Sequence, residues 1–258
     1  MRVQDEAAIE AIEEAVAWHT VGIAHSLDGK PKAAIGTGAV VRWRTFVAII
    51  TAHHVIRETD LGDFGFFFRP SGTFLRGHPD DQSLRNRLQY YPAKDIAISE
   101  VVENSALDLA ALIVPADIAE REMVRPFEID SSSAVPSVGD VVLLRGHPKD
   151  LARQLGPGMV ATFATHEWTT VTDRRPGGCK PDASEFFIEY TSADDWLPHG
   201  FSGGGIWYHT RIPDEPVWRP NLGLAGIATA YFSESRLIRA VAIDAVRQLL
   251  NQSRVQDQ

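Results

Sequence analysis

Cysteine is nearly absent from the sequence, since Cys179 is the only one among 258 residues. One cysteine excludes an internal disulfide framework and a cluster of thiolate metal ligands. No stretch approaches the roughly 18 uninterrupted apolar residues of a membrane helix. The N-terminus also lacks the basic start and apolar run of a signal peptide. We therefore expect a cytoplasmic protein with no membrane segment.

Positive charge is in the minority. The chain carries 25 Lys and Arg against 34 Asp and Glu, for a net charge of −9. This balance argues against a general affinity for nucleic acid or for an anionic membrane. Hydrophobic residues make up 44% and charged residues 23%, which is ordinary for a folded globular protein. The length suits one large domain, or two small lobes, with a proper core.

Short apolar or β-branched runs, separated by Gly, Pro, Asp and Ser, dominate from Thr20 onward. They predict strands at 21–24, 39–41, 46–50, 64–68, 96–98, 109–114, 141–144, 159–163, 186–190, 205–208 and 222–228. Many short strands at such spacing are typical of an all-β sandwich or barrel. Helical spacing of apolar residues predicts helices over 4–18 and 235–251. The less regular stretch 116–137 is interpreted as the connection between two β lobes.

Three segments carry chemistry, in the order imidazole, carboxylate, hydroxyl. They are Gly36-Thr37-Gly38 followed by Thr51-Ala52-His53-His54-Val55, then Asp108-Leu109-Ala110, then Gly200-Phe201-Ser202-Gly203-Gly204-Gly205. A serine hydroxyl is a poor nucleophile near neutral pH, so an imidazole must take its proton while a carboxylate holds that imidazole in the useful tautomer. Glycines around a serine allow a sharp turn. Such a turn can aim two backbone amides at one point, where an oxyanion would be stabilised.

Together these segments resemble the trypsin-like (chymotrypsin-fold) serine proteases, most closely the bacterial trypsin-like and HtrA-like branch that lacks disulfides. Two more segments, 138–148 and 224–229, resemble the strand that opens that family's second barrel and the strand that lines its substrate cleft. The resemblance covers about residues 20–250. It implies an all-β fold of two packed six-stranded antiparallel β-barrels with an N-terminal and a C-terminal helix.

The resemblance also implies a single peptidase domain over the whole chain. Its expected parts are an N-terminal helix at 1–19, a first β-barrel at 20–118, a connection at 119–137, a second β-barrel at 138–234, and a C-terminal helix and tail at 235–258.

Carried over residue by residue, the resemblance makes His54 the general base, Asp108 its orienting carboxylate and Ser202 the nucleophile. The amides of Gly200 and Ser202 would form the oxyanion hole. Such a mechanism needs no metal and no organic cofactor. Histidines at metal-ligand spacing are not found, and adjacent His53 and His54 would point to different sides.

Two of these roles have an alternative candidate. The family usually has Ala at the position of His53, so the two adjacent histidines leave open which one is the base, and His53 is the alternative to His54. Asp95 is an alternative carboxylate, because it is followed by the same apolar-Ala pattern as Asp108. We favour Asp108 because a longer apolar strand follows it.

The substrate side is expected near two segments. In the resembled family, the loop before the serine forms the floor of the primary specificity pocket. Trp196 lies six residues before Ser202 and is bulky enough to shorten that pocket, while the neighbouring Asp195 would attract Arg or Lys if the loop shifted. We favour a small or aliphatic substrate side chain. Gly226, Ile227 and Ala228 are expected to offer an edge strand to an extended peptide.

The predicted function is a serine endopeptidase that cleaves peptide or protein substrates through an acyl-enzyme. The alternative is a catalytically silent trypsin-fold module that binds peptides or proteins. An α/β-hydrolase requires Ser, then Asp or Glu, then His in chain order, with a helix directly after the serine. After Ser202 the only histidine is His209, and residues 206–208 are typical of a strand, so this class is excluded. Phe201 stands where secreted members carry an Asp that pairs with a cleaved N-terminus. We therefore expect no such zymogen activation, and hypothesise that a regulatory protein partner controls the cleft.

Overall fold

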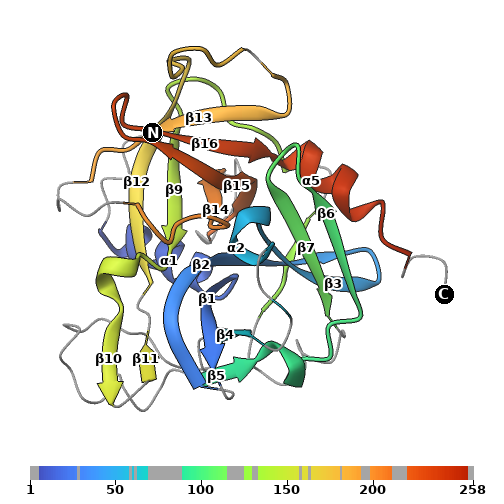
Figure 1. Ribbon diagram of the computed structural model, residues 1–258. Coiled ribbons are helices and arrows are strands. Elements are labelled where there is room, and N and C mark those ends of the chain that lie inside the picture. The colour runs from blue at the N-terminus through green and yellow to red at the C-terminus, as the bar shows by residue number, and fades with distance from the viewer. Residues whose placement is uncertain are drawn as a thin grey trace.

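The computed structural model describes residues 6–27, 30–57, 60, 63–68, 89–114, 125–129, 133–156, 159–161, 164–180, 182–192, 198–210 and 220–254. Most regular structure in these ranges is β-strand, divided between one large sheet and one closed barrel. Figure 1 shows most of the first sheet, coloured blue to green, in the lower and right parts of the view, and most of the barrel in the upper part. The all-β expectation is confirmed.

The first sheet is built by the N-terminal half of the described chain. Its strands are β1 (Thr20–Leu27), β2 (Lys30–Trp43), β3 (Phe46–Ala52), β4 (Phe64–Phe68), β5 (Gln89–Pro92), β6 (Glu100–Asn104), β7 (Leu109–Val114) and β8 (Phe127–Glu128). They run in the order β5-β4-β1-β2-β3-β7-β6, and β8 pairs with β2. The expectation of a purely antiparallel six-stranded unit is therefore wrong in detail. Pairing of β1 with β2 ends at Ala39, so β2 continues beyond it and accepts β8 in parallel at Val41 and Arg42.

The second sheet is a closed six-stranded antiparallel barrel. It contains β9 (Val141–Gly146), β12 (Thr165–Thr172), β13 (Glu185–Glu189), β14 (Gly205–His209), β15 (Leu222–Phe232) and β16 (Leu237–Ala242). A short two-stranded sheet, β10 (Arg153–Gly156) with β11 (Met159–Ala161), accompanies it. The expected two-unit architecture of this fold is thus confirmed.

Helices lie at both ends, as expected, with short ones between. They are α1 (Glu6–Ala17), α2 (His53–Ile56), α5 (Ile243–Leu250) and the 3-10 turns η1 (Ala93–Asp95) and η2 (Lys149–Leu151). The predicted helix over 235–251 is wrong in its first half, because β16 occupies that part. The predicted strand at 96–98 is also wrong, because the chain turns there and Ala97 has a φ of 52°.

Three apolar clusters form the core. One fills the first sheet and contains Ile49, another fills the barrel and contains Ile188. The third includes Ile50 from β3 and Trp207 from β14, together with residues of α1 and α5. Neighbours Ile49 and Ile50 therefore pack on opposite faces of one strand, and the second face joins the two sheets. No helix in the described ranges is long and apolar enough to cross a membrane.

Candidate active site

His54 and Asp108 meet where two neighbouring strands end. β3 and β7 are antiparallel, with Ala52 opposite Leu109. The backbone N–H of His53 donates to the carbonyl of Asp108 at 3.0 Å, which extends the ladder by one residue. The register therefore places Asp108 at the start of α2, within reach of His54.

The Asp108 carboxylate makes two hydrogen bonds with His54. Its Oδ1 accepts from the His54 backbone N–H at 2.9 Å, and its Oδ2 lies 2.7 Å from His54 Nδ1. Such a pair fixes the proton on Nδ1 and leaves Nε2 able to accept a proton. Asp108 has a φ of 55°, a left-handed conformation that Asp tolerates better than most residues.

The pKa of Asp108 reflects opposing effects. Partial burial raises the pKa of the Asp108 carboxyl. The side-chain and backbone hydrogen bonds with His54 act in the opposite direction and lower this pKa. The positive charges of His54 and Arg239 also lower it, so the pKa lies below its usual 3.8. The carboxylate is therefore ionised at neutral pH and able to stabilise an imidazolium on His54.

The two rival residues lie elsewhere. His53 Nε2 is 3.7 Å from an Oε atom of Glu103 on β6, so the adjacent histidines face different carboxylates. Asp95 is exposed at the end of η1. Of these four residues, His54 and Asp108 are the ones whose side chains the structure brings together.

The Ser202 segment is a tight turn whose peptide groups are held in place. The Phe201 N–H donates to the Pro198 carbonyl at 3.1 Å, and Gly200 has a φ of 101°. A type II turn requires positive φ at its third residue, hence glycine. The carbonyl of His199 accepts from Lys149 N–H at 2.7 Å.

Two amides of this turn remain available. Within the described ranges, neither the Gly200 N–H nor the Ser202 N–H has an acceptor. The Phe201 carbonyl between them is bonded to the Gly204 N–H at 2.7 Å. The C=O and N–H of a trans peptide point in opposite directions. The His199 carbonyl faces Lys149, so the Gly200 N–H points away from Lys149, and the Phe201 carbonyl faces Gly204, so the Ser202 N–H points away from Gly204.

The serine turn is attached to the first sheet through β2. Thr37 N–H donates to the Ser202 carbonyl at 2.8 Å, and Thr37 Oγ1 donates to the Gly200 carbonyl at 2.6 Å. A Cβ on Gly36 would lie 2.7 Å from both Cγ atoms of Val55 and 3.1 Å from the Ser202 carbonyl oxygen. Glycine therefore permits close approach of the serine turn to the α2 residue that follows His54. Within the described ranges, no hydrogen bond joins the Ser202 hydroxyl to His54.

The expected substrate strand is corrected by its register. Gly226 and Ile227 pair with β14 on one side and with β16 on the other, and Ala228 bonds the serine turn through Gly203 and Gly204. None of the three is therefore an edge residue. The edge on the β14 side begins at residue 229, where no described strand pairs with β15. Trp196 and Asp195 lie outside the described residues.

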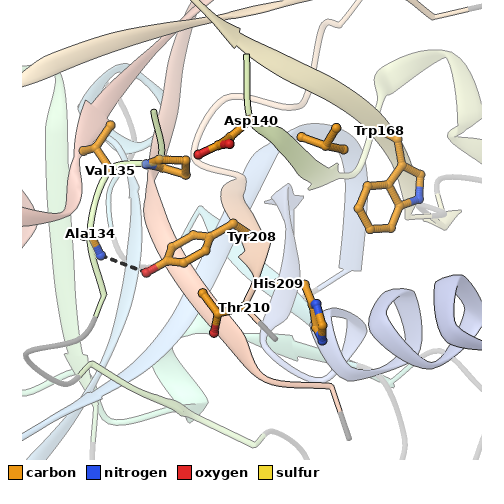
Figure 2. Close-up of a pocket in the computed structure, with 9 residues that line it drawn as sticks. Ala134, Val135, Asp140, Trp168, Tyr208, His209 and Thr210 are labelled. Carbon is orange, nitrogen blue, oxygen red and sulfur yellow. Dashed lines mark hydrogen bonds between the residues drawn. The ribbon is translucent and has the colours of Figure 1, made fainter. Parts of the chain in front are cut away.

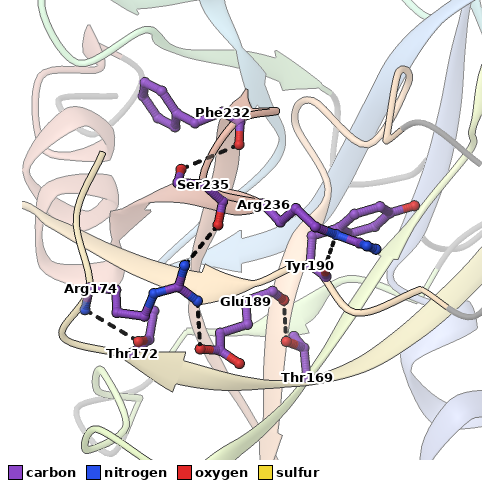
Figure 3. A network of polar contacts seen from close by, with 8 residues as sticks. All are labelled: Thr169, Thr172, Arg174, Glu189, Tyr190, Phe232, Ser235 and Arg236. Atoms are coloured by element: carbon purple, nitrogen blue, oxygen red, sulfur yellow. Dashed lines mark hydrogen bonds and ion pairs between the residues drawn. The ribbon is translucent and has the colours of Figure 1, made fainter. Parts of the chain in front are cut away.

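Two arginines of the second barrel make contacts near the end of β13 and the turn between β15 and β16. Arg236 Nε donates to the Tyr190 carbonyl at 3.3 Å, and Arg174 Nη2 donates to the Ser235 carbonyl at 3.1 Å. Figure 3 shows these contacts linking the ends of β12 and β13 to the turn between β15 and β16.

A separate hollow of about 220 Å³ lies beside β9 and β14. Trp168 and Tyr208 line it, and the Tyr208 hydroxyl accepts a hydrogen bond from the Ala134 N–H at 3.0 Å (Figure 2). It shares no residue with the His54, Asp108 and Ser202 segments. In the part of the chain that the structure describes, no group of three His, Cys, Asp or Glu residues could hold a metal ion.

Sequence reasoning missed the part played by Thr37. Its side chain is fully buried and bonds residues of the second barrel. The signal was a lone polar residue between two glycines in an apolar strand. Thr51 was also passed over, although its hydroxyl donates to the Thr37 carbonyl at 2.7 Å.

Comparison with known proteins agrees with this geometry. The family model described as a trypsin-like peptidase domain matches residues 36–210, which contain His54, Asp108 and Ser202. No curated protein sequence matches the chain significantly.

Solved structures share the fold at low identity. Human heparin binding protein has a TM-score of 0.56 and 14% identity, covering 91% of this chain and 92% of its own. The Rv3671c protease from M. tuberculosis, in its active form, has a TM-score of 0.54 and 16% identity, covering 96% and 86%. The scabies mite inactivated protease paralogue S-I1 has a TM-score of 0.55 and 16% identity, covering 92% and 96%. These likenesses establish the fold, and they include a protein whose name describes it as inactivated.

Proposed function

The chain belongs to the trypsin-like peptidase domain family, and from this premise we propose that it is a serine endopeptidase acting on peptide or protein substrates. The observation that carries the proposal is the His54–Asp108 pair, with 2.7 Å between Nδ1 and Oδ2. The serine turn lies against β2 through Gly36 and Thr37, and Gly36 also lies close to Val55 of α2.

In the proposed reaction, Ser202 Oγ attacks the carbonyl carbon of the scissile bond while His54 Nε2 takes the hydroxyl proton. The negative charge that develops on the carbonyl oxygen is stabilised by the free N–H groups of Gly200 and Ser202. The C–N bond then breaks, and His54 gives its proton to the leaving amine. A water molecule, activated by the same imidazole, hydrolyses the acyl-enzyme. Asp108 remains ionised throughout.

We propose that an extended substrate adds to the β15 edge beyond residue 228. This edge is supported by the pairing of Ala230, Tyr231 and Phe232 with β16 on the far side alone. Main-chain hydrogen bonds would give affinity there independently of side chains.

A silent peptide-binding module is the second candidate. The missing hydrogen bond between Ser202 and His54 favours it, although catalytic hydrogen bonds often tighten only when substrate binds. Incubation of the chain with an unfolded protein, followed by mass spectrometry of new termini, separates the two. We expect internal cleavage by the wild type and none by Ser202→Ala. Binding of the unfolded protein by both forms without new termini would establish the module instead.

We also propose that a regulatory protein partner speeds the reaction by holding Ser202 in line with His54 for more of the time than in the isolated chain. The proposal is supported by the absence of their hydrogen bond in the described residues. Cleavage by the isolated chain should then be slow and should accelerate when the partner is added. Constitutive cleavage at full rate by the isolated chain would contradict this control.

A further inference from the structure

Thr37 lies at the centre of the junction between the two sheets. Its side chain is completely buried. The hydroxyl donates to the Gly200 carbonyl at 2.6 Å and accepts from the His147 backbone N–H at 2.8 Å. A threonine hydroxyl has one proton to donate, and here that proton goes to the serine turn.

The two bonds hold two different loops of the second barrel. Gly200 belongs to the serine turn. His147 begins the segment that continues to Lys149, whose N–H donates to the His199 carbonyl at 2.7 Å. One hydroxyl therefore holds both the turn and the segment that fixes the turn's preceding peptide.

These contacts determine where the free Gly200 amide points. The His199 carbonyl and the Gly200 N–H belong to one planar peptide and point in opposite directions. Holding the carbonyl on Lys149 directs the N–H to the other side. Rotation of this peptide would break the Lys149 bond and move the N–H away from the Ser202 amide.

We propose that Thr37 is a positioning residue, whose hydroxyl holds the serine turn in the conformation that aims the Gly200 and Ser202 amides at one oxyanion. The inference rests on the proposed function. A residue of the first sheet would then position the oxyanion-hole amides, which belong to a loop of the second barrel.

Thr37→Val isolates the hydroxyl from the rest of the junction. Valine has nearly the same shape, but it leaves the Gly200 carbonyl and the His147 N–H without their partner. The backbone bond from Thr37 N–H to the Ser202 carbonyl does not need the side chain. Thr37→Ser keeps the hydroxyl and loses a methyl group.

Thr20→Val is the matched control for a lost buried hydroxyl. Thr20 is also buried, and its Oγ1 donates to the Val16 carbonyl at 3.1 Å, on the connection between α1 and β1. Its removal costs stability without touching the serine turn. Both valine variants should therefore unfold at lower temperature than the wild type.

The test measures the rate at which a fluorophosphonate labels Ser202 in each form. We expect Thr37→Val to label about 10-fold to 100-fold more slowly, somewhat less than the ~10²–10³ lost with an oxyanion donor itself. Thr37→Ser should retain most of the wild-type rate, and Thr20→Val should match the wild type. Equal labelling rates for Thr37→Val and the wild type would overturn the inference.

Amide hydrogen exchange over residues 198–204 distinguishes this failure from failure of the proposed function. If the wild type is not labelled at all, the proposed function is wrong, and exchange still reports on the turn. Faster exchange in Thr37→Val, but not in Thr20→Val, supports positioning by the hydroxyl. Unchanged exchange in Thr37→Val contradicts it.

Discussion

Asp108 holds His54 through both carboxylate oxygens, one on the backbone N–H at 2.9 Å and the other on Nδ1 at 2.7 Å. The first bond fixes where α2 begins, and the second fixes the tautomer of the ring. Neither bond depends on substrate, so this half of the site is already formed in the resting protein.

Asp108→Asn should therefore slow the labelling of Ser202 by about 10⁴-fold, the order of loss expected when the histidine adopts the wrong tautomer. Asp95→Asn is the matched control, because Asp95 is exposed on η1. We expect it to label at the wild-type rate. A loss in Asp95→Asn with normal labelling of Asp108→Asn would transfer the carboxylate role to Asp95.

The adjacent histidines should behave very differently. His54→Ala removes the group bonded to Asp108, and the rate of labelling should fall to near the background, a loss of about 10⁶-fold in enzymes with such a base. His53→Gln removes a side chain that faces Glu103 at 3.7 Å, so most of the rate should remain. The two rate constants are measured by intact-mass time courses. If His53→Gln were not labelled while His54→Ala was labelled at the wild-type rate, His53 would be the base instead of His54.

Gly200→Ala should disrupt the oxyanion turn. A Cβ there would lie 2.3 Å from the His147 carbonyl oxygen, and the φ of 101° is unfavourable for alanine. Gly178→Ala is the control, with a φ of 85° and nothing within 4 Å of its Cβ. Both should lose about 1–2 kcal/mol to the positive φ, and Gly200→Ala should lose more because of the clash, as measured by denaturant unfolding. Only Gly200→Ala should also lose labelling, and normal labelling of that variant would contradict the proposed position of the oxyanion hole.

Acid should destabilise the protein through His147. Burial, and to a smaller extent the positive charge of the nearby Arg145, lower the pKa of its imidazole from an ordinary 6.5 to about 3. The folded-state pKa is thus below the unfolded value. Stability is fully present above pH 6.5 and is lost as the pH falls from 6.5 towards 3, because the unfolded chain takes up the proton first. Each such proton contributes a slope of about 1.4 kcal/mol per pH unit.

His147→Gln should take up one proton fewer on unfolding, so its free energy of unfolding should change less steeply with pH. Denaturant unfolding at several pH values between 6.5 and 3 measures this slope. His19 should retain its own contribution, since burial lowers its pKa to about 4. An identical slope in the wild type and in His147→Gln would show that the imidazole is protonated in the folded protein.

The sequence predicts the all-β architecture well because its strand runs are short, apolar and clearly punctuated. It fails at β16, which was predicted as helix. Ile238 packs inside the barrel while Val241 packs on the opposite face against the other sheet. A strand buried on both faces lacks the alternation of polar and apolar residues that identifies a strand.

The candidate site shows the same limit. His54 and Asp108 could be paired from the sequence only through the resemblance to the trypsin-like proteases, whose motifs these residues match. Register could not be derived, so Gly226 was expected at an edge although it is paired on both sides. The contacts of Thr37 could not be predicted either, because its partners His147 and Gly200 lie more than a hundred residues away along the chain.

The measurement that tests the central claim most directly is intact-mass spectrometry after fluorophosphonate treatment of the wild type and of Ser202→Ala. The account predicts one adduct per chain, mapped by peptide sequencing to Ser202 and absent from the variant. A folded wild type without an adduct, or an adduct that persists in Ser202→Ala, would contradict it.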